Sequence, residues 1–270
     1  MTLSLGSLGI ATGLDSGPAS LKAARIVEDL GFSMLWLTGG PLPGLHTITD
    51  VIRATSSLQV ASGILSVDRY AAGDVAALYA EHPDRFVVGL GGAHGPQPVR
   101  TIDAYLDRLD AVPTDRRVLA ALGPRMLELA RDRTAGALPV LITTEYAARA
   151  RQILGPDRTL AVEQLVVLEA DPARAREIGR GPLRFLTRLP GYAASFRRMG
   201  FTEDELSNLD DRLVDAVIAW GDESAVEARV NDLRGAGADH VALSVLTGET
   251  GPQPVEEWRR LAALNRPTGP

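Results

Sequence analysis

The sequence alternates between short apolar runs and longer segments of helical periodicity, and this alternation constrains the fold more than any other feature. Eight apolar or β-branched runs recur along the chain, each followed by a segment with a recognisable helix start. Such a pattern favours βα units and a parallel sheet. Eight units need roughly 250 residues, so the length fits one α/β domain, residues 1–270, folded as a (β/α)8 TIM barrel. The predicted strands are Leu8–Thr12, Met34–Leu37, Gln59–Ile64, Arg85–Leu90, Val118–Leu122, Leu138–Ile142, Gln164–Leu168 and His240–Val245.

The stretch between the last two predicted strands is far longer than one barrel helix needs. It contains two candidate capping boxes, Thr202 with Glu205 and Ser224 with Glu227, which are typical of helix starts. An unstructured loop of this length is uncommon in a compact domain. We therefore predict a helical insertion between strands seven and eight, at about residues 179–213, near one mouth of the barrel.

An open, doubly wound sheet is the alternative arrangement of the same elements. Its usual fingerprint is missing, because the run from Gly89 to His94 has a histidine where the third glycine of G-x-G-x-x-G belongs. No lysine motif of the P-loop type is present either. The barrel is the better interpretation, and its site then lies at the carboxyl ends of the strands.

The composition excludes several function classes. The chain has no cysteine, which removes disulfides, thiolate nucleophiles, iron–sulfur clusters and cysteine-ligated zinc, and no two histidines have ligand spacing, so we predict no metal site. The net charge of −6 and the lack of long basic runs argue against a nucleic-acid partner. We see no signal peptide and no apolar stretch near the roughly 18 residues of a membrane span, so we expect a cytoplasmic protein without a membrane partner.

The residues that follow the predicted strands are mostly glycines and hydroxyl-bearing side chains. This set suits a bulky, polar ligand that approaches the backbone closely. His94 follows the fourth strand and is the one imidazole at a predicted strand end. Because imidazoles titrate near neutral pH, His94 is a candidate to bind a ligand oxygen or to move a proton. A loop histidine that only caps backbone groups is the alternative.

Two predicted helix starts follow the adjacent strands five and six. Gly123-Pro124 begins one helix, and Thr143-Thr144 begins the next. Helix N-termini expose free N–H groups and the positive end of the helix dipole, which accommodate a phosphate. Simple helix capping explains each pair taken alone, but two such starts side by side favour a phosphate site.

Several segments resemble one known family. The run Ala80–Gly91 resembles the helix-to-strand signature of the bacterial luciferase-like superfamily, and Val118–Ala130 resembles its phosphate-binding strand and helix. Arg212–Ala216, Trp220–Asp222 and Gly237–Val241 resemble the C-terminal part of the actinobacterial branch of probable F420-dependent oxidoreductases. The similarity runs from about residue 7 to residue 262.

The resemblance implies a barrel with an insertion before the last strand, usually homodimeric. It also implies a flavin-shaped coenzyme, F420 or alternatively FMN, across the strand ends and a small-molecule substrate above its ring. We assign the phosphate to Leu122, Gly123, Pro124 and Thr143, and the ring to Thr38, Gly63, Ile64 and Leu65. The pair Gly63-Ile64 matches one that often forms a non-prolyl cis peptide behind the ring, and His94 falls beside the ring's reactive carbon as the catalytic residue.

Two departures from the family pattern leave the activity open. Relatives often carry an acid after the second strand, where this chain has Thr38-Gly39-Gly40, and the loop after His94 is shortened, so that Pro98 begins a helix almost at once. Both changes lie around the ring. Three functions therefore remain: an oxidoreductase that transfers hydride with F420, an FMN-dependent monooxygenase, and a non-catalytic coenzyme- or ligand-binding barrel.

Overall fold

Eight parallel strands close into a barrel in a computed structural model that describes residues 3, 5–38, 40, 42–248 and 251–265. The strands follow one another around the barrel in chain order, and the last pairs with both the first and the seventh. This confirms the predicted TIM barrel. The barrel strands are β1 (Leu8–Thr12), β2 (Met34–Thr38), β3 (Gln59–Gly63), β5 (Phe86–Gly91), β6 (Arg117–Leu119), β7 (Gly136–Ala137), β8 (Thr159–Val167) and β10 (His240–Val245). Two short strands add to them: β4 (Leu65–Ser66) pairs with β5, and β9 (Ile218–Trp220) pairs with the end of β8.

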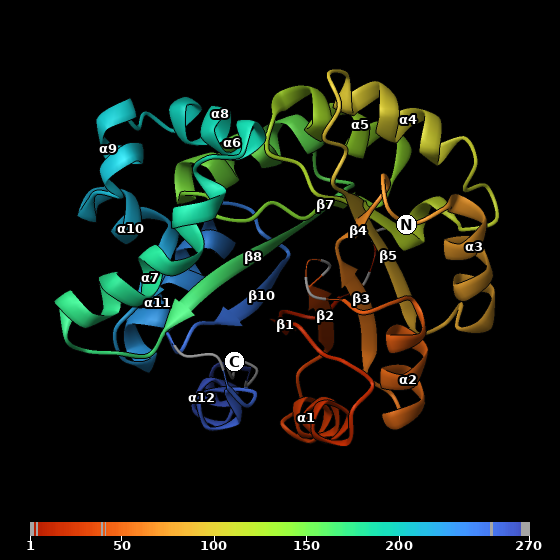
Figure 1. The fold of residues 1–270 in the computed structure, drawn as a ribbon, viewed down its shortest axis with the longest axis horizontal. Helices are drawn as coiled ribbons and strands as arrows, with labels where there is room; N and C mark the ends of the chain where they lie inside the picture. The colour runs from red at the N-terminus through yellow and green to blue at the C-terminus, as the bar shows by residue number, and fades with distance from the viewer. Residues whose placement is uncertain (1–2, 4, 39, 41, 249–250, 266–270) are drawn as a thin grey trace.

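A ring of helices surrounds the strands (Figure 1). These are α1 (Pro18–Asp29), α2 (His46–Ala54), α3 (Ala72–Glu81), α4 (Pro98–Leu106), α5 (Pro124–Arg133), α6 (Thr144–Leu154), α7 (Pro172–Leu186), α11 (Glu223–Gly235) and α12 (Val255–Leu261), with 3-10 turns at Thr114–Arg116 and Ala262–Asn265. Two begin where the sequence predicts: Pro124 stands in the first turn of α5, and Thr143 caps α6. No helix in the described part of the chain is long and apolar enough to cross a membrane.

The strands divide their side chains between two cores. Because successive side chains on a strand point to opposite faces, one set packs outward against the helices and the other fills the barrel. Leu35 and Leu37 of β2 belong to the outer core, whereas Met34 and Trp36 belong to the inner one. The inner core is otherwise built from small and medium side chains, among them Ala61, Val87, Val118, Ala161 and Ala242.

The sixth and seventh predicted strands differ most from the bounds in the structure. The sixth was predicted at Leu138–Ile142, but β7 covers Gly136–Ala137, and beyond it only Val140 forms an isolated bridge to Glu163. Pro139 lies between them and lacks the N–H group that a continuous ladder needs. The seventh was predicted at Gln164–Leu168, but β8 begins five residues earlier, at Thr159.

Between β8 and β10 the chain forms helices and one short strand. After α7 come α8 (Pro190–Arg198), α9 (Glu203–Asn208) and α10 (Asp211–Val217), and these three helices lie together at one side of the ring (Figure 1). They share a separate hydrophobic cluster that includes Phe196 and Val214. The predicted capping box at Thr202 and Glu205 is confirmed. The one at Ser224 is wrong, because Asp222 caps α11 instead. The predicted insertion limit at residue 179 falls inside α7.

Candidate active site

The strand register places four inward-facing residues at one level near the carboxyl end of the barrel. The strands of a (β/α)8 barrel are tilted, so a plane perpendicular to the barrel axis cuts each strand one residue beyond the residue that is paired with the strand before it. The side chains that point into the barrel at one such level come from alternate strands and form a layer. Following the observed pairings from β8 around the barrel gives a mouth layer of Ala11, Gly63, Ala120 and Glu163. One residue higher on the remaining strands, Thr38, Gly91, Val140 and Ser244 form a rim layer.

The mouth and rim layers contain mostly small side chains. Gly63, Ala120 and Glu163 are partly exposed, although each lies on the inner face of the barrel. The next layer down is closed, because Trp36 and Leu138 are buried there. Solvent therefore reaches into the barrel as far as the mouth layer, and Trp36 lies beneath it.

The residues predicted to support the ring lie at this mouth. Thr38 pairs with Gly63 at the ends of β2 and β3, and the Gly63–Ile64 peptide is cis, as the family pattern predicts. The side chain of Ile64 packs inward beside Gly91, where a Cβ atom would come within 3.1 Å of Ile64 Cδ1. Leu65 differs, because its side chain is fully buried in the outer core and is not available to a ligand. Gly39 lies outside the described residues.

The residues predicted to bind phosphate begin α5. Gly123 is the N-cap and Pro124 the first helical residue, and no side chain caps this helix. Pro124 has no N–H group and the N–H of Met126 donates to the Gly123 carbonyl at 3.0 Å, so the N–H of Arg125 is the first-turn donor available to an anion. The side chain of Arg198 on α8 lies directly beside this helix start. Its Nη2 donates to the carbonyl of Leu122 at 2.8 Å, and a Cβ atom on Gly123 would lie 3.7 Å from that nitrogen. A positive charge thus stands next to an uncapped helix start.

The start of α6 is already partly satisfied by its own residues. Thr143 Oγ1 accepts from the backbone N–H of Tyr146 at 3.2 Å. Glu145 lies in the first turn, and hydrogen bonds from its own backbone N–H and from the Thr143 hydroxyl lower the pKa of its carboxyl group. Tyr146 ties the two helix starts together, because its hydroxyl donates to the carbonyl of Ala121 at 3.2 Å. The start of α5 is therefore the better anion site of the two.

His94 lies on the exposed loop between β5 and α4. Its side chain is 71% exposed. Asp68 Oδ2 accepts from the backbone N–H of His94 at 3.0 Å and lies 3.3 Å from its Nδ1. The structure thus gives His94 a carboxylate partner that orients the imidazole, at the border of the barrel mouth rather than inside it.

The comparisons with known proteins concern the fold. No protein-family profile matches the chain, and neither does any curated protein. Among solved structures, an F420-dependent secondary alcohol dehydrogenase in complex with an F420–acetone adduct is similar with a TM-score of 0.71 at 14% identity, covering 98% of this chain and 100% of that one. The chain has the bacterial luciferase-like fold.

Two further structures with the luciferase-like fold widen the comparison. The coenzyme F420-dependent tetrahydromethanopterin reductase from Methanopyrus kandleri has a TM-score of 0.67 at 15% identity, covering 96% of this chain and 98% of that one. The oxygenating constituent of 3,6-diketocamphane monooxygenase from Pseudomonas putida, in complex with FMN, has a TM-score of 0.66 at 13% identity, with 96% and 98% covered. At such identities the likeness concerns the fold.

The mouth of this luciferase-like barrel also holds a residue that the sequence prediction missed. Glu163 lies in the middle of β8, and Ser244 of β10 donates a hydrogen bond to its carboxyl group. Burial raises the pKa of Glu163 to about 7. A single acid within the apolar run Leu160–Val167 is the sequence signal that indicates it, but the predicted strand began one residue too late to include it.

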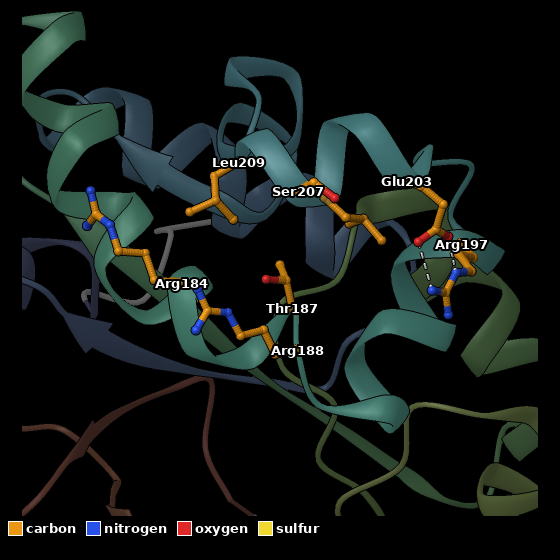
Figure 2. Close-up of a pocket in the computed structure, with 8 residues that line it drawn as sticks. Arg184, Thr187, Arg188, Arg197, Glu203, Ser207 and Leu209 are labelled. Atoms are coloured by element: carbon orange, nitrogen blue, oxygen red, sulfur yellow. Dashed lines mark hydrogen bonds and ion pairs between the residues drawn. The ribbon is translucent and has the colours of Figure 1, made fainter.

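Two depressions in the protein surface lie outside the mouth and rim layers. Figure 2 shows one of them, which is lined by Arg184, Thr187 and Arg188 near the end of α7 and by Ser207 and Leu209 near the end of α9, and in which Arg197 is paired with Glu203. Its volume is about 310 Å³. It includes none of the strand-end residues. A groove of about 700 Å³ runs between α1 and α12 and meets the barrel at the end of β1. Its residue Gln253 accepts from the Thr12 hydroxyl at 2.7 Å and donates to the carbonyl of Gly13 at 2.8 Å.

Proposed function

We propose that the protein is an oxidoreductase that binds the deazaflavin coenzyme F420 across the mouth of its barrel and transfers a hydride to or from a small organic substrate. One observation carries this proposal: an open, small-residue mouth lies beside an uncapped helix start with an arginine over it. A coenzyme with a flat ring joined to a phosphate needs an open surface for the ring and, beside it, a site for the phosphate. The F420-dependent enzymes of the same fold support the choice of coenzyme.

The residues present fit such a group. The first turn of α5 and the guanidinium of Arg198 would hold the phosphate, and the mouth layer would receive the ring. Below it, the buried Trp36 excludes water from the lower barrel. When bound, the coenzyme supplies the hydride chemistry, whereas the chain supplies binding, orientation and proton exchange.

We propose His94 as the residue that exchanges the proton. The contact with Asp68 orients its imidazole, and its exposure lets it exchange protons with water. We expect His94→Ala to lower turnover about 100-fold and to change the pH dependence of turnover, because general acid–base groups contribute on this scale. Steady-state rates across a pH series measure this. Full turnover with an unchanged pH profile would show that His94 has no such role.

An FMN-dependent monooxygenase is the second candidate. The specific observation in its favour is that the FMN complex of the diketocamphane monooxygenase constituent shares the fold over 96% of this chain. The mouth layer does not distinguish the two coenzymes by shape, because their ring systems differ little in shape. The choice therefore depends on affinity.

Titration of the purified protein with F420 and with FMN distinguishes the candidates. Preference for F420 together with a substrate-dependent absorbance change supports the first function, and preference for FMN supports the second. Binding without turnover across a broad set of substrates would favour a ligand-binding barrel, and binding of neither would contradict every coenzyme function. The homodimer, the cytoplasmic location and the absence of a nucleic-acid partner stay predictions.

A further inference from the structure

Glu163 is the one ionisable side chain in the mouth and rim layers. Its three partners in the mouth layer are two alanines and a glycine, and the rim layer adds only Thr38, Gly91, Val140 and Ser244. Glu163 therefore projects into space that the other strands leave free. Glu163 is partly exposed, so solvent reaches this level of the barrel.

Among the residues that the structure describes, none brings an opposite charge to Glu163. Ser244 of β10 donates to its carboxyl group, the segment after β7 contributes Pro139 and Val140, and α8 contributes the phenol of Tyr192. Among the described residues, Tyr192 is the titratable group that interacts electrostatically with Glu163, and burial together with Glu163 raises the pKa of that phenol to about 12. Burial raises the pKa of Glu163 itself to about 7. At and below neutral pH the carboxyl group therefore retains an O–H donor.

We propose that Glu163 binds the ring of the coenzyme, donating a hydrogen bond from its carboxylic acid to a carbonyl oxygen of the ring. This inference rests on the proposed function. Flavins and deazaflavins both carry carbonyl oxygens on one ring, and a ring resting on the Gly63–Ile64 peptide lies at the level of Glu163. Such oxygens accept hydrogen bonds and donate none. They therefore bind the protonated carboxyl group of Glu163 and repel its ionised form.

Equilibrium binding of F420 and of FMN at pH 6 and at pH 8.5 tests the proposal. The dissociation constant of the wild-type protein should rise about tenfold over this range, because ionisation replaces a donor by a negative charge. Glu163→Gln keeps a donor that does not ionise, so its affinity should match wild type at pH 6 and exceed it at pH 8.5. Any titration of the coenzyme itself is common to both proteins and cancels in the comparison.

Two further variants keep the test decisive. Glu163→Met has similar volume and no donor, so it should bind about tenfold more weakly than Glu163→Gln at both pH values. Glu169→Gln removes an acid just beyond β8 that pairs with Arg174, and it should keep the wild-type pH profile. Equal pH dependence in wild type and Glu163→Gln would overturn the role of Glu163 while leaving the coenzyme in place. If wild type binds neither coenzyme, the proposed function fails and the inference with it.

Discussion

Glu163 is the one ionisable residue on the inward face of β8. Taking its carboxyl group out of water disfavours the charged form, and the hydrogen bond from Ser244 compensates only in part. In the unfolded chain the same carboxyl group ionises near pH 4.5. Between pH 4.5 and about 7 the unfolded chain has thus lost a proton that the folded chain retains, and the stability of the fold decreases as the pH rises through this window.

Glu163→Gln should therefore stabilise the protein without coenzyme at pH 8, and should do so less at pH 4.5. We expect a gain on the order of 2 kcal/mol in the free energy of unfolding at pH 8, since solvent at the mouth reduces the penalty that a sealed carboxyl group would suffer. Urea denaturation of both proteins at the two pH values measures it. A constant difference between them would show that Glu163 titrates normally.

The sequence indicated the positions of some site residues but not of others. Gly123 and Thr143 follow directly from helix-start chemistry, and both stand where that chemistry predicts. Recognising Glu163 from the sequence required the exact start of its strand, and periodicity places the ends of strands less accurately than the strands themselves. Arg198 could not be placed from the sequence, because its position over Leu122 depends on contacts between distant segments that no local pattern encodes.

Helix α8 connects the insertion to the barrel mouth. Tyr192, Ser195 and Arg198 follow one another at three-residue spacing and so lie along one face of the helix. Tyr192 interacts with Glu163, whereas Ser195 and Arg198 bond to the carbonyl of Leu122. The same helix therefore borders both the ring region and the phosphate region of the proposed site.

The two adjacent arginines of α8 offer a matched comparison. Arg197 pairs with Glu203 on the protein surface, and Arg198 lies over the start of α5. We expect Arg198→Ala to weaken coenzyme binding about tenfold, because a charge-assisted bond to phosphate is lost, and Arg197→Ala to leave it unchanged. Titration of both variants with F420 or FMN measures the difference. Equal losses in the two variants would point to a general effect on α8 rather than to a phosphate contact.

The barrel fold could be predicted because the same pattern of strand and helix recurs along the whole sequence. Each unit repeats the same apolar run and helix start, so an error in one strand leaves the others in place. Strand six was misplaced because the apolar run Leu138–Ile142 contains Pro139, which removes a ladder donor. The layers inside the barrel were not predicted. They depend on which residues are paired between neighbouring strands, and this register can be derived only when the positions of all eight strands are known.

The lower end of the barrel is held by a buried histidine that joins three segments. His240 Nε2 accepts from Trp36 Nε1 at 3.0 Å, and Nδ1 donates to the carbonyl of Gly6 at 2.9 Å. These two partners fix the neutral imidazole, because a carbonyl only accepts and an indole N–H only donates. Burial lowers the pKa of His240 to about 4, from an ordinary value of 6.5.

The barrel should therefore lose stability as the pH falls below about 6.5, because the unfolded chain then binds a proton at His240 and the folded chain does not. We expect a loss of about 2 kcal/mol between pH 7.5 and pH 5 from this one group. Urea denaturation of wild type and His240→Gln at both pH values isolates it, because acidic groups contribute equally to the two proteins. The variant should be less stable at pH 7.5, where it lacks the fitted ring, and should lose less on acidification. An equal loss in both proteins would mean that the lower barrel admits a charged imidazole, and that Trp36 does not require a neutral partner.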